Sequence, residues 1–208
     1  MPGEGSSFGL VLLHGRGAGA ADILGLGSAL ALPDVSLIAP EAPQLSWWPT
    51  SFLAPSAQME PYVQAGFDQI DTAVATLQDA GLPLGRIGLL GFSQGGCLTS
   101  EYLARKGAGL GFVFILSGGL VGTADQGESD AALYGFADKA LDYPTEISGV
   151  QVYMSCHEQD PHIPHKRFSD TATVLQRLGA TVEHRTKPGA GHGIDEGDVA
   201  AVRKLLNR

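Results

Sequence analysis

Cysteine, positive charge and long apolar runs are all scarce in this sequence. Cys97 and Cys156 are the two cysteines among 208 residues, and both stand in apolar stretches, so we expect buried thiols rather than a disulfide framework. No apolar run approaches the roughly 18 residues of a membrane span, which predicts no stable membrane association. Lys and Arg number 13 against 22 Asp and Glu, for a net charge of −9. Without a basic cluster, no nucleic acid partner is expected.

The first residues also lack the basic and then apolar segments of a secretory signal. We therefore expect a cytoplasmic protein. Apolar residues make up 44% of the chain and charged residues 17%, a balance typical of folded globular proteins. The length predicts one domain over residues 1–208. The sequence leaves open whether the protein is a monomer or a homodimer.

Apolar runs of strand length alternate with longer segments of helical pattern. The expected strands are Phe8–Leu13, Val35–Ala39, Ile87–Gly91, Gly111–Leu116, Val150–Ser155 and Thr181–Arg185. The expected helices are Asp22–Ala31, Glu60–Ala80, Gln94–Lys106, His165–Leu178 and Asp195–Leu206. Several strands are continuous apolar runs, as in sheets that are covered on both faces. This alternation predicts an α/β fold, with a mostly parallel central sheet and helices on both faces.

Two stretches interrupt the alternation. Pro40–Pro61 is rich in proline, serine and aromatic residues and is predicted to be a long loop. Gly118–Gly149 is glycine-rich and polar, with one helix expected near Asp130–Leu141. Each stretch follows the carboxyl end of a strand, where open α/β sheets form their ligand sites.

The pattern Gly-x-Ser-x-Gly occurs twice, around Ser7 and around Ser93. No strand precedes Ser7, whereas Ser93 follows a buried strand and precedes a helix, which is the context of a nucleophile elbow. There the serine adopts strained backbone angles and needs glycines two residues before and after it, at Gly91 and Gly95. The alternative is a glycine-rich turn with an incidental serine.

A nucleophilic serine needs a histidine base, and the base needs a carboxylate to fix its tautomer. Asp160 follows one expected strand and His192 follows the next, in the order Ser, Asp, His. All three therefore belong to the same edge of the sheet. The alternatives without a catalytic role are a turn or helix-capping aspartate at Asp160 and a surface histidine in a flexible loop at His192. Asp195 is the nearest rival carboxylate, and we interpret it as an N-terminal helix residue favoured by the dipole.

Two backbone amides are expected to form an oxyanion hole. The amide of Gln94 lies at the start of the helix after Ser93, and the amide of Arg16 follows the first strand in His14-Gly15-Arg16-Gly17. The Arg16 side chain has three open interpretations: it closes over the site, or it pairs with Glu41 or with Asp22.

These segments resemble the phospholipase/carboxylesterase family, which includes acyl-protein thioesterases and sits beside the dienelactone hydrolases. The segments that carry the resemblance are His14–Ala18, Pro40–Pro43, Gly91–Gly96, His157–Pro161 and Gly191–Gly193. The resemblance covers almost the whole chain. It implies an α/β-hydrolase fold without a large lid, no cofactor and no metal.

Residue by residue, the resemblance assigns Ser93 as nucleophile, Asp160 as acid, His192 as base, and the amides of Arg16 and Gln94 as oxyanion donors. Glu158 stands where many members have glycine, and Arg16 where thioesterases usually have an apolar residue. The form His-Gly-Arg-Gly is more similar to the bacterial carboxylesterases of this family than to its members that remove lipid from proteins. Cys97 does not occupy the position of the dienelactone hydrolase cysteine. The resemblance thus implies a serine esterase acting on a small-molecule ester, with thioester or lysophospholipid substrates as the alternative.

Trp47 and Trp48, with Phe52 and Leu53 nearby, are candidates for lining an apolar acyl slot. Covering the core beneath the loop is an equally good interpretation of the tryptophans. His157 and His162, near the acid loop, are interpreted as structural residues.

Three readings from other classes stay open. Gly15–Ala20 fits Gly-x-Gly-x-x-Ala, with Glu41 further on, which is a dinucleotide-binding pattern. Four potential metal ligands fall within nine residues: His157, Asp160, His162 and His165. The third reading is a catalytically silent binding protein, because a fold alone does not give a function.

Overall fold

The computed structural model describes residues 6–32, 34–127 and 135–206. Its centre is a six-stranded sheet in the order β2-β1-β3-β4-β5-β6, with every neighbouring pair parallel. The strands are β1 (Phe8–Leu13), β2 (Val35–Ile38), β3 (Ile87–Phe92), β4 (Phe112–Leu116), β5 (Gln151–Gln159) and β6 (Thr181–Ala190). The prediction of an α/β fold with a parallel sheet is confirmed.

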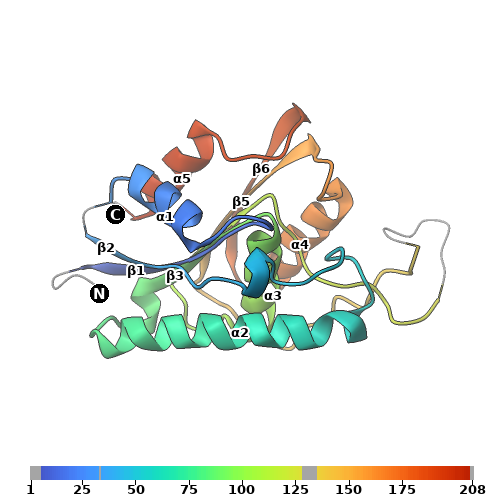
Figure 1. Ribbon diagram of the computed structural model, residues 1–208, viewed down its shortest axis with the longest axis horizontal. Coiled ribbons are helices and arrows are strands. Elements are labelled where there is room, and N and C mark those ends of the chain that lie inside the picture. The colour runs from blue at the N-terminus through green and yellow to red at the C-terminus, as the bar shows by residue number, and fades with distance from the viewer. Residues whose placement is uncertain (1–5, 33, 128–134, 207–208) are drawn as a thin grey trace.

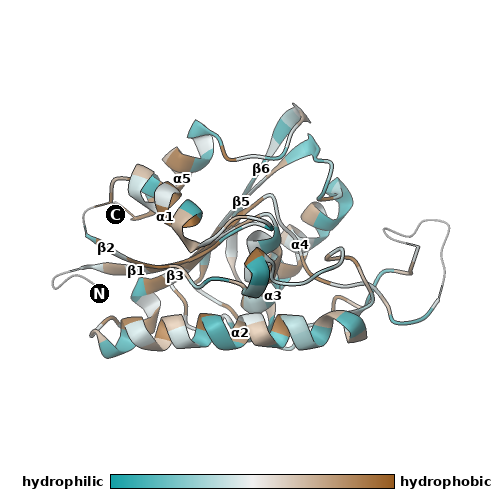
Figure 2. Ribbon diagram, viewed as in Figure 1, coloured by the Kyte–Doolittle hydropathy of each residue, from teal (hydrophilic) through white to brown (hydrophobic). Residues whose placement is uncertain are grey.

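Helices cover both faces of this sheet (Figure 1). They are α1 (Ala20–Ala29), α2 (Ser56–Asp79), α3 (Gln94–Lys106), α4 (His165–Arg177) and α5 (Glu196–Leu206). One core cluster joins the sheet to α2, α3 and α4, and a second joins its other face to α1 and α5. The strands are brown at the centre of Figure 2, whereas α2 alternates between the two colours. Among the described residues, no helix is long and apolar enough to span a membrane.

Side-chain alternation along the strands separates the two cores. In β1, Leu10 and Leu12 belong to the cluster beneath α1 and α5, and Val11 and Leu13 to the cluster beneath α2, α3 and α4. All four side chains are fully buried. Successive residues of a strand point to opposite faces, so a strand covered on both sides must be apolar throughout. This explains the continuous apolar runs in the sequence.

The last two strands are longer than the sequence predicts. They run past the end of β4 as a two-stranded extension, with an irregularity between His157 and Gln159 where β6 gains one residue. That residue falls at Pro188-Gly189, and Gly189 has a φ of 74°, which glycine adopts without steric cost. The extension is polar and carries no apolar pattern, so the predicted ends at Ser155 and Arg185 were too early.

Helix α2 begins within the stretch that we expected to be a loop. It starts at Ser56, so the predicted loop Pro40–Pro61 is wrong over its last six residues, and Pro61 lies inside the helix. Contacts distant in sequence hold this first turn: the Ser56 N–H donates to the Thr123 carbonyl (3.1 Å) and the Ala57 N–H to Asp125 (2.6 Å). They satisfy first-turn donors that a helix leaves unpaired.

The helix expected near Asp130–Leu141 is not found where the structure can test it. Residues 130–134 lie outside the described residues, and residues 135–141 are not helical. The fully buried carboxylate of Glu101 on α3 instead bonds Lys139 and Tyr143, which lie in a segment without regular secondary structure. These contacts are long-range and have no counterpart in the local pattern.

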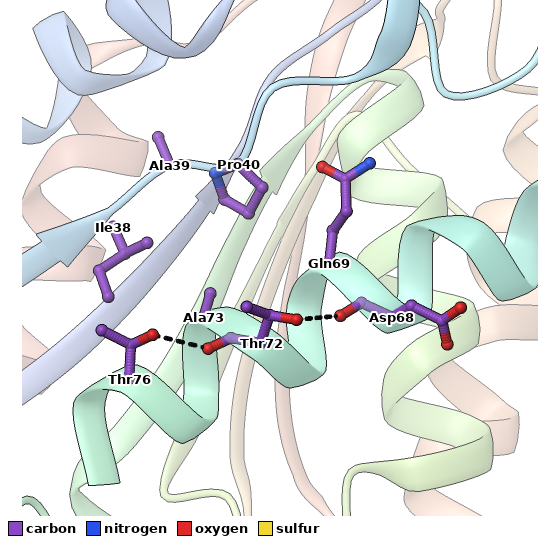
Figure 3. Close-up of a pocket in the computed structure, with 8 residues that line it drawn as sticks. All are labelled: Ile38, Ala39, Pro40, Asp68, Gln69, Thr72, Ala73 and Thr76. Carbon is purple, nitrogen blue, oxygen red and sulfur yellow. Dashed lines mark hydrogen bonds between the residues drawn. The ribbon is translucent and has the colours of Figure 1, made fainter. Parts of the chain in front are cut away.

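A cavity of about 400 Å³ lies between the end of β2 and α2 (Figure 3). Its lining residues are Ile38, Ala39, Pro40, Asp68, Gln69, Thr72, Ala73 and Thr76. None of them is a predicted site residue.

The central strand β3 should dominate stability because it is buried on both faces. Truncating fully buried Leu89 by Leu89→Ala removes apolar contacts and leaves a cavity, so we expect the free energy of unfolding to fall by about 2–5 kcal/mol. Urea unfolding measures the change. The same truncation at Leu45, which is 39% exposed, is the control and should cost about 0.5 kcal/mol. Equal losses in the two variants would contradict this account of the core.

Candidate active site

Ser93 lies between β3 and α3 in a strained backbone conformation. Its φ is 56° and its ψ is −118°, a region that costs a non-glycine residue on the order of 1–3 kcal/mol. The Ser93 N–H donates to the carbonyl of Leu116 (2.9 Å), and the Ser93 carbonyl accepts from the N–H of Cys97 (2.9 Å). The strain is therefore held in place by hydrogen bonds to the end of β4 and within α3.

The flanking glycines are required by close backbone contacts. A Cβ on Gly91 would lie 2.2 Å from the carbonyl oxygen of Gly95, and a Cβ on Gly95 would lie 2.2 Å from that of Leu13. Both distances are too short for any side chain. The first turn of α3 thus packs directly on the ends of β3 and β1, as the elbow pattern predicts.

Ser93, His192 and Asp160 form one hydrogen-bonded chain. His192 Nε2 is 2.8 Å from Ser93 Oγ, and His192 Nδ1 is 2.9 and 2.8 Å from the two carboxylate oxygens of Asp160. With the carboxylate accepting from Nδ1–H, Nε2 is left to accept the proton of the serine hydroxyl. The structure thereby brings together the three side chains that the sequence singled out.

Asp160 is held by four donors, three of which the sequence did not indicate. Besides His192, the backbone N–H groups of His162 (2.9 Å) and Ile163 (3.0 Å) donate to Oδ1, and the thiol of Cys156 lies 3.5 Å from Oδ2. Burial raises the pKa of Asp160, but the hydrogen bonds from His192 and from the two backbone groups outweigh it and lower the pKa to about 2. Burial raises the pKa of Cys156 to about 12, so its thiol keeps its proton and can donate. The carboxylate is thus held ionised.

The two predicted oxyanion donors flank Ser93. Gln94 is the first residue of α3, and a Cβ on Gly15, the neighbour of Arg16, would lie 3.3 Å from Ser93 Cβ. Among the described residues, neither the Arg16 N–H nor the Gln94 N–H donates to a backbone carbonyl in a turn, loop or cap. Two backbone donors beside the hydroxyl are the arrangement that stabilises a developing oxyanion.

The Arg16 side chain pairs with neither Glu41 nor Asp22. Its guanidinium donates to backbone carbonyls in the loop after β2, those of Trp48, Pro49 and Thr50. Glu41 and Asp22 instead accept from the backbone N–H groups of Ala20 (3.1 Å) and Gly19 (2.7 Å) at the start of α1. These carboxylates take the donors that a dinucleotide phosphate needs at a helix N-terminus. The geometry therefore disfavours the dinucleotide-binding reading.

Two side chains that sequence reasoning did not assign hold the loop after β2 against the site. Buried His14 accepts from the Ala42 N–H at Nε2 (3.0 Å), and its own carbonyl accepts from the indole N–H of Trp47 (2.9 Å). The Gln94 side chain accepts from the Trp47 N–H (2.9 Å) and donates to the Trp48 carbonyl (2.8 Å). The polar side chain of Gln94 at the start of a buried helix could have indicated that it bonds another part of the chain. Nothing in the local pattern identified its partners.

Both tryptophans lie inside the core beneath this loop. Trp47 is 4% exposed and Trp48 1%, as the core-covering interpretation requires. Their role in lining an acyl slot stays a prediction.

The histidines near the acid loop do not gather around one point. The His162 ring meets the His192 ring edge to face at 4.7 Å, whereas His165 lies 3.2 Å from the Thr186 hydroxyl. In the part of the chain that the structure describes, no group of three His, Cys, Asp or Glu side chains is placed to hold a metal ion. The four residues of the metal-site alternative therefore form no common site. Asp195, the rival carboxylate, pairs with Arg185 at 2.8 Å and caps α5.

The chain is similar to known proteins over most of its length. Residues 3–208 match the phospholipase/carboxylesterase family. Acyl-protein thioesterase 1 of Gibberella zeae is 30% identical over 131 residues, which cover 62% of this chain and only 51% of the thioesterase. The match thus spans about half the length of that curated relative.

Solved structures are similar over nearly the whole chain. A phospholipase/carboxylesterase from Dyadobacter fermentans is 32% identical with a TM-score of 0.83, covering 98% of this chain and 91% of its own. A carboxylesterase from Mesorhizobium loti is 22% identical with a TM-score of 0.70, covering 97% and 89%. The second likeness supports the fold alone.

The contact of Gly95 with β1 can be tested by adding a single methyl group. We expect Gly95→Ala to lower the free energy of unfolding by about 1–3 kcal/mol, because the new Cβ has to displace backbone at the end of β1. Urea unfolding gives the value. Gly25→Ala is the matched control, since nothing lies within 4 Å of its Cβ on α1, and it should stabilise by about 0.4–1 kcal/mol. A neutral Gly95→Ala would refute the tight elbow.

The low pKa of Asp160 predicts a pH-dependent contribution to stability. A carboxylate whose pKa is lowered by folding stabilises the native state above its unfolded pKa, and this is lost as the pH falls through about 2. We expect the difference in unfolding free energy between wild type and Asp160→Asn to shrink by about half from pH 6 to pH 3. Urea unfolding at both pH values measures it. A difference that stays constant or grows at pH 3 would contradict the prediction.

Proposed function

The chain belongs to the phospholipase/carboxylesterase family, and from that premise we propose that it is a serine carboxylesterase that hydrolyses small carboxylic esters through an acyl-enzyme on Ser93. The observation that carries the proposal is the continuous hydrogen-bonded chain from Ser93 through His192 to Asp160. The family and its solved relatives support hydrolase chemistry.

Acylation follows from the geometry of these groups. Ser93 Oγ attacks the ester carbonyl carbon while His192 Nε2 takes its proton, and the ionised Asp160 stabilises the resulting imidazolium. The negative charge that develops on the carbonyl oxygen is met by the N–H groups of Arg16 and Gln94. When the tetrahedral intermediate collapses, the C–O bond to the alcohol breaks and Nε2 returns the proton to the leaving oxygen.

Deacylation uses the same groups in reverse. His192 takes a proton from water, the hydroxide attacks the acyl carbon, and the proton then passes to Ser93 Oγ as the acid leaves. Every step is a proton transfer or a displacement at carbon, so side chains and backbone suffice. The half-buried Ser93 and His192 leave the site open to a small substrate.

A thioesterase is the second candidate, favoured by the match to the thioesterase of Gibberella zeae. Thioesters follow the same route with a thiolate as leaving group. Comparing kcat/KM on an acyl ester with that on the thioester of the same acyl group separates the two candidates.

The serine is tested by ester hydrolysis with an internal control. We expect wild type to hydrolyse p-nitrophenyl esters with a maximum at short acyl chains. Ser93→Ala should lose the activity to background, because it removes the hydroxyl that lies 2.8 Å from His192 Nε2. The measurement is the initial rate from acetate to decanoate. Ser7→Ala changes the exposed serine of the second Gly-x-Ser-x-Gly pattern and should keep full activity. Activity retained in Ser93→Ala would overturn the mechanism.

A further inference from the structure

His192 lies on a segment with few fully buried side chains. From Thr181 to Ala201, which covers β6 and the first half of α5, the buried residues are Lys187 and Asp198. The loop between them contains Gly189, Gly191 and Gly193, and glycine loses more conformational freedom on folding than any other residue. Ile194 packs against the core and the His157 ring against Gly191, so the remaining restraint on the histidine loop has to come from polar contacts.

The two buried residues form an ion pair that reaches into this loop. Lys187 Nζ donates to Asp198 Oδ2 (2.9 Å) and to the carbonyl oxygen of Gly193 (2.6 Å), the residue next to His192. Lys187 is 1% exposed and Asp198 is fully buried. The ammonium therefore connects the strand before the loop, the helix after it and the loop itself.

Asp198 is in turn fixed from two further directions. Its Oδ1 accepts from the Tyr153 hydroxyl on β5 (3.0 Å), and its Oδ2 accepts from the Asp195 N–H at the start of α5 (3.0 Å). Burying two charges costs several kcal/mol per ion, and an apolar pair is often as stable or more so. An apolar pair, however, offers no donor to the Gly193 carbonyl.

We propose that Lys187 is a positioning residue for His192, held in place by Asp198, and that its hydrogen bond to the Gly193 carbonyl keeps the imidazole aligned between Ser93 and Asp160. The Lys187 ammonium bonds Gly193 and Asp198 rather than a triad side chain, so it acts through the loop backbone. The proposal rests on the proposed function in one respect, that alignment of His192 matters for turnover.

Two double variants isolate the hydrogen bond from the charge. Lys187→Met/Asp198→Asn and Lys187→Gln/Asp198→Asn both remove the ion pair and are close in volume, but only glutamine can donate to the Gly193 carbonyl. On the best p-nitrophenyl ester we expect the Met variant to lose about 10–100-fold in kcat with KM within about twofold, because a displacement of about 1 Å in a catalytic group can cost this much. The Gln variant should recover most of kcat.

Two single variants control for stability. Lys139→Met breaks the contact of a lysine with fully buried Glu101 at a distant site and should leave kcat unchanged. Asp198→Asn removes the charge but keeps a side-chain oxygen that can accept from Lys187 Nζ, so Lys187 stays in place. We therefore expect kcat to stay within about threefold even though stability falls, which thermal unfolding records. Equal kcat losses in the two double variants, or a tenfold loss in Asp198→Asn, would overturn the proposal. The Asp198→Asn test stands even if the Met variant does not fold.

A signal that does not require turnover separates this proposal from the proposed function. The Nδ1 proton between His192 and Asp160 should give a low-field proton NMR resonance, assigned by its loss in His192→Gln. We expect it in wild type and in the Gln double variant, and we expect it broadened or lost in the Met double variant. An intact resonance in the Met variant overturns the positioning role. Full activity in Ser93→Ala would overturn the proposed function but leave this result standing.

Discussion

The direct contact of the first turn of α3 with the ends of β1 and β3 is the constraint on which the rest of the site depends. At Gly91 and Gly95 the backbones approach so closely that no Cβ fits. That approach forces Ser93 into its strained conformation and brings Gly15 within van der Waals distance of it. Ser93, the start of α3 at Gln94 and the backbone at Gly15 are therefore brought together by one packing interaction.

Polar side chains connect the ends of β1 and α3 to the loop after β2. His14 extends from the end of β1 and Gln94 from the start of α3, and each bonds the backbone of the loop. An unpaired buried donor or acceptor costs about 1–3 kcal/mol, so the loop cannot shift without losing several such bonds. The guanidinium of Arg16 adds bonds from the outside. The loop after β2 is thus held by polar contacts, which a pattern of hydrophobic residues cannot predict.

This difference explains what the sequence could and could not predict. The bounds of β1 and α3 were predicted to within a residue. For β1 the reason is that a strand buried on both faces consists of a continuous run of apolar residues. Ser93, Asp160 and His192 follow strand ends in a fixed order, which is why the sequence could single out the side chains that form the hydrogen-bonded chain. The polar extension of β5 and β6, the early start of α2 and the amide clamp of Gln94 were missed. Each of these depends on partners far away in the sequence, and a local pattern cannot identify them.

The three members of the triad are held by different physical means, and this bears on how each can fail. Ser93 is held by backbone packing, and Asp160 by backbone N–H groups within its own turn. His192 stands in a glycine-rich loop whose flanking residues are partly exposed, with the His157 ring packed against Gly191. In the proposed mechanism His192 exchanges protons with both Ser93 and the substrate, so it needs access as well as alignment. A buried ammonium bonded to the neighbouring carbonyl meets both needs, because it fixes the backbone from the interior and leaves the imidazole face open.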